Sequence, residues 1–190
     1  MTHRFLIMGP QGAGKGTQAA LLAQRAEVPA ISTGDIFRAN IKGETELGKL
    51  AQSFTSRGEL VPDSVTNDMV RDRLGQQDTA EGFILDGYPR NAAQVEALDG
   101  ILADLGWSLD AVIVLTADRD ELLGRLSRRA ELEGREDDTA ETIARRLDIY
   151  EQETAPLIDA YRARGLLVEV DGIGEIDAVA ERIDVALAAR

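Results

Sequence analysis

The chain has 190 residues, enough for one well-buried α/β core and short for two independent domains. It contains no cysteine, which excludes disulfides and a structural zinc site with thiolate ligands, and no run of ~18 apolar residues that would cross a membrane. These features lead us to expect a cytoplasmic protein that does not bind a membrane, and the net charge of −13, from 34 acidic and 21 basic residues, argues against a nucleic-acid partner.

The first motif is a glycine-rich loop after a short apolar strand at Phe5–Met8. Glycines let several backbone N–H groups curl around one anion, and the helix expected over Gly16–Arg25 adds its N-terminal dipole. Lys15 supplies a full positive charge that can follow a phosphoryl group during its transfer. The spacing G-x-x-x-x-G-K predicts a nucleoside triphosphate site. Its residues are Gly12, Ala13, Gly14, Lys15, Gly16 and Thr17.

The hydroxyl that normally reaches magnesium is displaced in this loop. Ser or Thr usually follows the lysine directly, but here Gly16 follows it and Thr17 comes one place later. We therefore predict no direct protein ligand for the Mg²⁺ that accompanies the nucleoside triphosphate. The nucleotide phosphates and water would hold the ion, which suits its reluctance to dehydrate.

Apolar, β-rich runs recur along the chain and are separated by longer helix-prone stretches. They cover Phe5–Met8, Ala30–Ser32, Phe83–Asp86, Ala111–Thr116 and Leu166–Val170. This alternation is typical of βα units whose parallel strands are buried on both faces. We predict an α/β P-loop fold, a three-layer sandwich with a five-stranded parallel sheet and ligands at the carboxyl ends of the strands.

Two inserts interrupt this rhythm within a single domain of residues 1–190. Residues 32–62 are too long for a simple crossover and are predicted to form a mostly helical flap. Residues 129–135 form a much shorter insert. After it, Asp138 and Glu141 fit a capping box that would begin a long helix, and Pro156 is expected to kink or divide that helix.

Polar residues follow the second and third strands. The hydroxyl of Thr33 and Arg38 on the next helical turn can hold a second phosphate or its base. This pattern alone favours Arg38 as a surface residue. Asp86 closes the third strand beside the glycine-rich loop, where a carboxylate linked to magnesium belongs. Gly87 and the residues after it form a rigid turn that aims Arg90, and one turn further the amide of Gln94 can read the edge of a base.

Arginines are concentrated in the last third of the chain. They are Arg125, Arg128, Arg129, Arg135, Arg145 and Arg146. We interpret Arg128 and Arg145 as surface residues paired with neighbouring glutamates. The other four, on two facing helices and the insert between them, are predicted to clamp the charge of a phosphoryl group in flight.

Together these segments resemble the adenylate kinase family of nucleoside monophosphate kinases across essentially the whole chain. Five motifs stand in the order of the family. They are Gly9-Pro10-Gln11-Gly12-Ala13-Gly14-Lys15-Gly16-Thr17, Ser32-Thr33-Gly34-Asp35, Gly58-Glu59-Leu60-Val61-Pro62-Asp63, Asp86-Gly87-Tyr88-Pro89-Arg90 and Arg135-Glu136-Asp137-Asp138. Residues 130–134 replace the larger lid of long-form members, so the chain resembles the short-lid type.

The resemblance implies reversible, Mg²⁺-dependent transfer from ATP to AMP to give two ADP, in adenine nucleotide homeostasis, by a monomer with strand order 2-3-1-4-5. It implies that Lys15 and Arg129 hold ATP, whose adenine touches the backbone at Gly174. It also implies an AMP site of Thr33, Arg38, Glu59, Leu60, Val61, Gly87, Tyr88, Pro89, Arg90 and Gln94. Arg135 and Arg146 would bridge toward the AMP phosphate, and the catalytic set would be Lys15, Asp86, Arg90, Arg129, Arg135 and Arg146.

Two other functions stay open at this point. A UMP/CMP kinase also has a short lid, but such kinases tend to carry Ala in place of Thr33 and Asn in place of Gln94, so both positions favour AMP. A catalytically silent nucleotide sensor is expected to have lost Lys15 or the arginines, and all of them are present.

Overall fold

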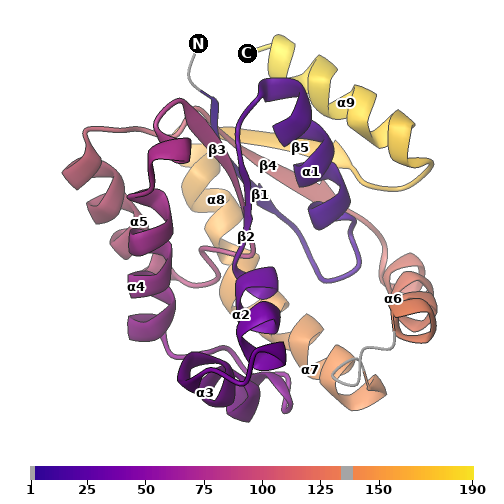
Figure 1. Ribbon diagram of the computed structural model, residues 1–190. Helices are drawn as coiled ribbons and strands as arrows, with labels where there is room; N and C mark the ends of the chain where they lie inside the picture. The colour runs from indigo at the N-terminus through magenta and orange to yellow at the C-terminus, as the bar shows by residue number, and fades with distance from the viewer. Residues whose placement is uncertain (1–2, 134–138) are drawn as a thin grey trace.

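The structure is a computed structural model that describes residues 3–133 and 139–190. Five parallel strands form one sheet in the order β2-β3-β1-β4-β5 (Figure 1). The strands are β1 (His3–Met8), β2 (Ala30–Ser32), β3 (Gly82–Asp86), β4 (Ala111–Thr116) and β5 (Leu167–Asp171). The predicted fold class and strand order are thereby confirmed, with β5 lying one residue later than expected.

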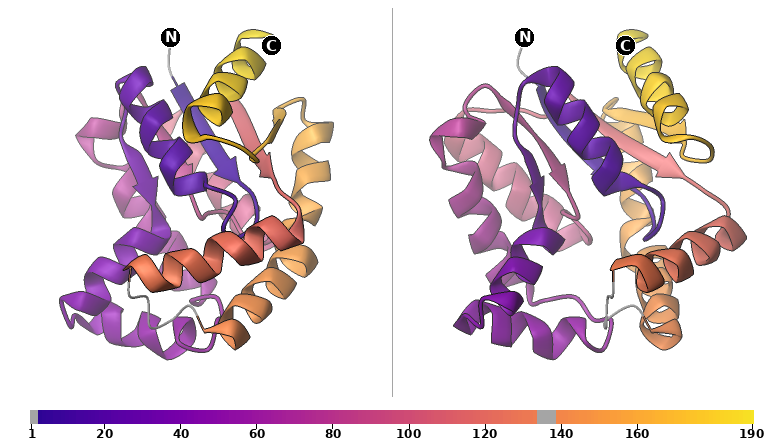
Figure 2. Two further views of the ribbon diagram at one scale, coloured as in Figure 1. Left: turned by 90° about the vertical axis from the view of Figure 1, so that its right-hand side faces the viewer. Right: turned by 45° about the vertical axis from the view of Figure 1, so that its right-hand side comes forward.

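Helices cover both faces of the sheet (Figures 1 and 2). One face carries α1 (Lys15–Ala26) and α9 (Ile176–Ala188). The other face carries α4 (Asp63–Leu74), α5 (Ala92–Leu105) and α8 (Pro156–Ala163). Near the carboxyl ends of the strands lie α2 (Thr33–Lys42), α3 (Glu46–Thr55), α6 (Arg119–Glu133) and α7 (Ala140–Ile149), while both termini lie at the opposite end (Figure 1).

The continuous apolar strands are explained by burial on both sides. Successive side chains of a strand point to opposite faces. In β1, Phe5 and Ile7 pack in the cluster with α1 and α9, while Leu6 and Met8 pack in the cluster with α4, α5 and α8. Both faces therefore require apolar residues, and the polar ends of the strands are left to build a site.

Residues 33–62 are mostly helical, as predicted, and have a small apolar cluster of their own. Phe37, Ala51 and Val61 are its buried members. Helix α3 crosses α2 so closely that a Cβ at Gly48 would lie 2.1 Å from the carbonyl oxygen of Asn40, which only glycine permits. The segment thus packs largely on itself beside the main core.

The long helix near the C-terminus departs from the prediction at its start. Helix α7 begins at Ala140, and the hydroxyl of Thr139 accepts a hydrogen bond from the Thr142 N–H at 3.2 Å. The predicted capping box was therefore wrong, because Thr139 caps the helix one residue later; Asp138 lies outside the described residues. As expected, the helix is divided before Pro156, by a π-helical segment at Tyr150–Thr154.

In the part of the chain that the structure describes, no helix combines the length and apolar character that a bilayer crossing requires.

Candidate active site

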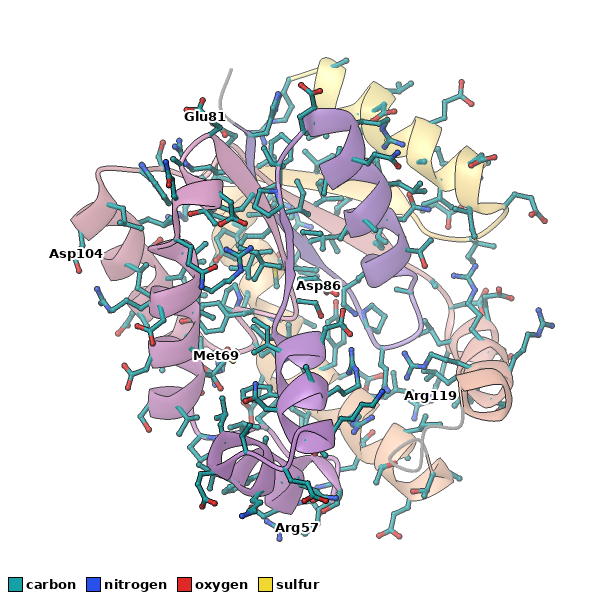
Figure 3. The ribbon with its side chains drawn as sticks, in the orientation of Figure 1. Arg57, Met69, Glu81, Asp86, Asp104 and Arg119 are labelled. Carbon is teal, nitrogen blue, oxygen red and sulfur yellow. The ribbon has the colours of Figure 1, made fainter. Side chains whose placement is uncertain are left out.

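A cavity of about 830 Å³ opens at the carboxyl ends of the strands. The glycine-rich loop, the ends of β2 and β3, and helices α2, α6 and α7 all contribute to its wall. Asp86, at the end of β3, lies in the middle of this region between α1 and α2 (Figure 3). The cavity brings together most residues of the two predicted nucleotide sites, which are far apart in the sequence.

The glycine-rich loop has the backbone that the motif predicts. Gly9, Gly12 and Gly14 have φ values of 145°, 88° and 91°, which residues with a Cβ rarely adopt. Helix α1 begins directly after them at Lys15, whose Nζ donates a hydrogen bond to the Pro10 carbonyl at 3.1 Å. The ammonium group therefore curls back over the loop that would surround a phosphate.

Lys15 and Asp86 are two opposite charges held in a poorly solvated place. Burial lowers the pKa of Lys15, and the nearby Asp86 carboxylate partly opposes this. Burial raises the pKa of Asp86, against the attraction of Lys15 and Arg90. Asp86 Oδ1 is buried without a hydrogen-bond partner in the described residues, and a Cβ at Gly16 would lie 3.9 Å from Oδ2. The carboxylate therefore has capacity left for a ligand or its water.

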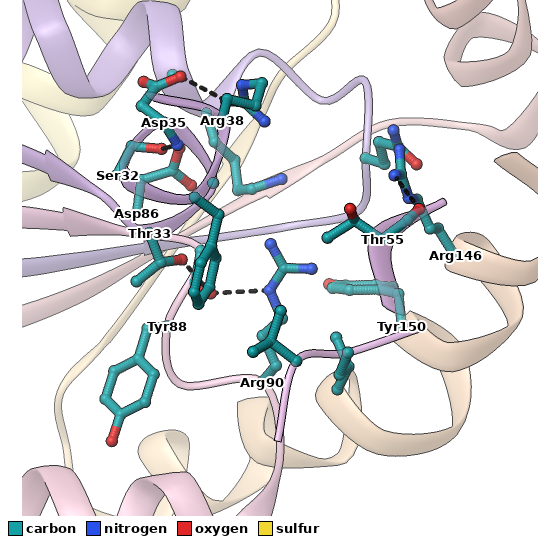
Figure 4. A pocket seen from close by; sticks show the side chains of 18 of the residues that line it. Ser32, Thr33, Asp35, Arg38, Thr55, Asp86, Tyr88, Arg90, Arg146 and Tyr150 are labelled. Atoms are coloured by element: carbon teal, nitrogen blue, oxygen red, sulfur yellow. Dashed lines mark hydrogen bonds and ion pairs between the residues drawn. The ribbon is translucent and has the colours of Figure 1, made fainter. Parts of the chain in front are cut away.

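The turn after β3 is joined to the start of α2 through one carbonyl. The Gly87 carbonyl accepts hydrogen bonds from Thr33 Oγ1 at 3.0 Å and from Arg90 Nε at 2.8 Å (Figure 4). Gly87 has φ 83°, and a Cβ there would lie 2.7 Å from Thr33 Oγ1. Glycine is thus required at this position for the hydroxyl and the arginine to converge.

Arg90 is held at three points of its backbone and side chain. Its backbone N–H donates to Gln94 Oε1 at 2.8 Å, its carbonyl accepts from Thr154 Oγ1 at 2.6 Å, and its Nε is bound to Gly87. The two Nη atoms have no hydrogen-bond or ion-pair partner within residues 3–133 and 139–190. Burial lowers the pKa of this guanidinium. It is held ready to bind an anion in the cavity.

Gln94 also lines the cavity, but its amide is already engaged on both sides. Besides accepting from Arg90, it donates from Nε2 to Asp63 Oδ1 at 2.8 Å, and the residue is 2% exposed. An amide oxygen has a second lone pair and an amide nitrogen a second hydrogen. A base would therefore meet one remaining acceptor and one remaining donor.

The other predicted residues differ in how they meet the cavity. Thr17, Leu60, Val61, Pro89 and Tyr88 line it, although the Tyr88 hydroxyl turns to Asn67 Oδ1 at 2.7 Å. Arg38 is exposed at the wall and paired with Asp35. Glu59 is paired with Arg57 at 2.8 Å and with Arg145 at 2.7 Å.

The arginines of α6 and α7 fall into two groups, half-buried ones on the cavity wall and exposed ones away from it. Arg125, Arg129 and Arg146 are half-buried and line the cavity. Arg125 is paired with Glu121 at 2.7 Å, and Arg146 Nη2 donates to the Thr55 carbonyl at 3.1 Å. Arg128 and Arg145 are exposed and do not line it.

Three predicted site residues are not on the cavity wall as described. The side chain of Ala13 is buried in the core cluster with residues of α1 and α9, at 1% exposure. Gly174 is exposed in the loop after β5, which nevertheless contacts the phosphate loop, because a Cβ at Gly172 would lie 3.1 Å from the Ala13 carbonyl oxygen. Arg135 lies outside the described residues.

Several wall residues escaped the sequence analysis. Tyr150 and Thr154 come from the π-helical segment, and Tyr150 lies near Arg90 (Figure 4). Burial raises the pKa of the Tyr150 hydroxyl. No sequence signal marks Tyr150 or Thr154, whereas Gln11 lies inside the phosphate-loop motif and could have been included.

A phosphate loop at the end of β1 and a second charged half-site around the same cavity define a P-loop nucleotide kinase. Comparison of the sequence with protein families agrees, since residues 7–166 match the model of the adenylate kinase family. The chain belongs to the adenylate kinase family, and it is a nucleoside monophosphate kinase.

Curated relatives support this placement over nearly the full length. The adenylate kinase of Bifidobacterium longum is 64% identical over 180 residues, which are 95% of this chain and 97% of that protein. The adenylate kinase of Kocuria rhizophila is 61% identical over 184 residues, covering 97% and 98% of the two chains. That of Thermobifida fusca is 54% identical over 187 residues, covering 98% and 99%.

Proposed function

We propose that this protein transfers the terminal phosphoryl group of ATP to AMP, reversibly, with ATP on the phosphate loop and AMP against Thr33, Arg90 and Gln94. One observation carries this division. The phosphate loop and the turn after β3 line a single cavity, in which Lys15 belongs to one side and Arg90 to the other. Two phosphate-binding groups that share one space allow a phosphoryl group to pass between nucleotides without release.

Transfer then depends on positive charge between the two phosphate-binding groups, where the phosphoryl group moves. Lys15, Arg129 and Arg146 would follow the moving phosphoryl group, while Arg90 holds the AMP phosphate through its free Nη atoms. Arg38 would have to exchange Asp35 for that phosphate, since it is exposed and paired. Arg135, which stands outside the described residues, is assigned to the same clamp by the resemblance alone.

The two adenines would bind apart from each other, and only the AMP base would lie on the described cavity wall. The AMP base would lie between the backbone of Glu59–Val61 and the amide of Gln94, all of which line the wall. The ATP base would contact the backbone at Gly174. This placement is supported by α1, in which Gln18 Nε2 donates to the Ile176 carbonyl at 2.9 Å and so ties the start of α9 to the phosphate-loop helix.

The described residues fit a magnesium ion that the nucleotide itself carries. Among them, no three His, Cys, Asp or Glu side chains form a cluster able to hold a metal. The unpartnered Oδ1 of Asp86 suits a hydrogen bond from water on the ion, and Thr17 is exposed at the same wall. When bound, Mg²⁺ would neutralise charge on the phosphates.

We also propose that residues 32–62 act as a flap over AMP and residues 129–135 as a short lid over the phosphates, so that water is excluded. The separate packing of the first segment supports this. The protein would work as a monomer in the cytoplasm on ATP, AMP and ADP, without nucleic acid or membrane. The net charge of −13 and the absence of cysteine support that setting.

A coupled assay with MgATP and AMP, CMP, UMP or GMP in turn tests the proposal. AMP should be the preferred acceptor, with two ADP formed for each ATP consumed. Equal use of AMP and CMP would contradict the assignment of AMP and favour the pyrimidine kinase. Binding of ATP without transfer to any monophosphate would favour the nucleotide sensor.

A further inference from the structure

We propose that Asp63 fixes the orientation of the Gln94 amide, so that the cavity accepts adenine and rejects guanine and uracil. The inference rests on the proposed role of Gln94 in reading the AMP base. It makes Asp63 a positioning residue for specificity, since Asp63 does not line the 830 Å³ cavity. It lines a neighbouring hollow, to which Asn91 also contributes.

The contacts around Asp63 are those of a fixed support. Asp63 is the first residue of α4, directly after the segment 32–62. Its Oδ1 accepts from Gln94 Nε2 at 2.8 Å and from Asn91 Nδ2 at 3.0 Å. Asn91 in turn accepts from the Gln94 N–H at 2.9 Å and caps α5. The start of α4 is thereby bound to the start of α5 at the base-reading amide.

Only one orientation of the Gln94 amide satisfies both of its neighbours. The backbone N–H of Arg90 can only donate, and the Asp63 carboxylate can only accept. Rotation of the amide by 180° would place NH₂ against the Arg90 N–H and an oxygen against the carboxylate. Two favourable hydrogen bonds would become two repulsive contacts in a site that is almost fully buried.

A fixed amide presents a fixed pattern to the base. Its free lone pair lies on Oε1 and its free hydrogen on Nε2, so it matches an edge with one donor and one acceptor in the corresponding order. Adenine offers N6–H and N1 in that order, whereas guanine offers O6 and N1–H, and uracil O4 and N3–H, in the reverse order. Guanine and uracil would each place an acceptor against the Gln94 oxygen and a donor against its NH₂ group.

Cytosine has the same order as adenine, with N4–H and N3, so polarity alone does not reject it. Its single ring is smaller than a purine. With the phosphate held by Arg90, its edge would not extend as far toward Gln94. The inference therefore predicts a particular ranking, in which GMP and UMP are rejected by polarity and CMP by size.

The test measures kcat/KM for AMP, GMP, UMP and CMP at saturating MgATP. Asp63→Ala removes the acceptor and leaves Gln94 with the Arg90 N–H alone. The ratio of kcat/KM for AMP to that for GMP should fall about tenfold, mainly through a higher KM for AMP. The ratio of kcat/KM for AMP to that for UMP should fall likewise. Asp63→Asn keeps an oxygen that can accept from Nε2 and should retain most of the wild-type ratio.

Further variants separate this role from a merely structural one. Asp63→Ser keeps a short polar group at the start of α4 but cannot reach Gln94, so it should behave as Asp63→Ala does even if the alanine variant folds poorly. KM for ATP should stay within about twofold in every Asp63 variant. The double variant Asp63→Ala/Gln94→Ala should have the same ratio of kcat/KM for AMP and GMP as Gln94→Ala alone, because Asp63 acts through the Gln94 amide.

The outcomes distinguish a failure of the proposed role of Gln94 from a failure of the proposed role of Asp63. If Gln94→Ala keeps the preference for AMP, the proposed reading of the base by Gln94 fails. If Gln94→Ala abolishes the preference while Asp63→Ala and Asp63→Ser leave the AMP/GMP ratio unchanged, Gln94 reads the base without Asp63 and the inference is overturned. A parallel fall in kcat/KM for all four monophosphates overturns it equally.

Discussion

The hydroxyl of Thr154 donates a hydrogen bond to the backbone carbonyl of Arg90 at 2.6 Å. Thr154 closes the π-helical segment Tyr150–Thr154, in which the helix widens by one residue between α7 and α8. Such wide turns are frequently found at functional sites. Here the turn places a hydroxyl against the peptide of Arg90, 64 residues earlier in the chain.

Thr154→Val should weaken the hold on Arg90 while keeping the shape of the side chain. The carbonyl of Arg90 would lose its partner in a partly buried place, and the guanidinium would be less well aimed at the AMP phosphate. We expect kcat/KM for AMP to fall about tenfold, with KM for ATP almost unchanged. Steady-state kinetics with each substrate varied will measure this. Thr154→Ser keeps the hydroxyl and should behave as wild type; equal values for valine and serine would show that the bond is irrelevant to transfer.

Lys15→Ala should reduce turnover far more than it weakens ATP binding. The charge of Lys15 is most useful when the phosphoryl group lies between donor and acceptor. We expect kcat to fall by about three orders of magnitude and the Kd for ATP to rise by no more than about tenfold. Single-turnover kinetics and calorimetry measure the two quantities separately. Lys49, which is exposed on α3 away from the cavity, provides the control variant Lys49→Ala.

Arg129 and Arg128 are neighbours on α6 and form a matched pair. Arg129 is half-buried on the cavity wall, whereas Arg128 is exposed and away from it. Arg129→Ala should lower kcat by at least about a hundredfold, because a transition-state cation is lost. The kcat of Arg128→Ala should stay within about twofold of the wild-type value. Comparable losses in both variants would mean that the arginines act through the general charge of the helix.

The regular part of the fold could be predicted because its causes are local. The limits of β2 and β4 follow from apolar runs, and the phosphate loop follows from the spacing of its glycines. The boundary of α8 follows from Pro156, which lacks the N–H that a continuing helix needs. These features depend on a few adjacent residues, so a sequence pattern is sufficient to find them.

The supports of the site could not be predicted, because they join distant segments. Asp63 and Gln94 are 31 residues apart, and no periodicity relates them. The π-helical turn differs from an α-helix only in which carbonyl each N–H selects, and Tyr150–Thr154 contains no glycine or proline to mark it. The Asp138 cap was wrong for a related reason, because Thr139 offers an equally good capping hydroxyl one position later.

Asp86→Asn should stabilise the nucleotide-free protein at pH 7 while lowering its activity. Burial raises the pKa of Asp86 above its ordinary value of 3.8, so the folded protein disfavours the carboxylate. Wild-type stability is therefore lost as pH rises from 3.8 through the folded-state pKa, and a neutral amide avoids that loss. We expect the free energy of unfolding at pH 7 to rise by about 1 kcal/mol. Urea unfolding at several pH values measures it.

The pH dependence separates this charge effect from a packing effect. The gain from Asp86→Asn should shrink as the pH falls through the raised folded-state pKa toward 3.8, because a growing fraction of the folded wild type then carries the proton. The exposed Asp78 serves as a control of opposite sign, since its hydrogen bond with Arg73 lowers its pKa. Asp78→Asn should lower stability slightly at pH 7, and this loss should shrink as the pH falls through the lowered pKa. If the gain in the free energy of unfolding for Asp86→Asn is equal at pH 7 and pH 4, the gain comes from packing. The Asp86 carboxylate would then not destabilise the nucleotide-free protein.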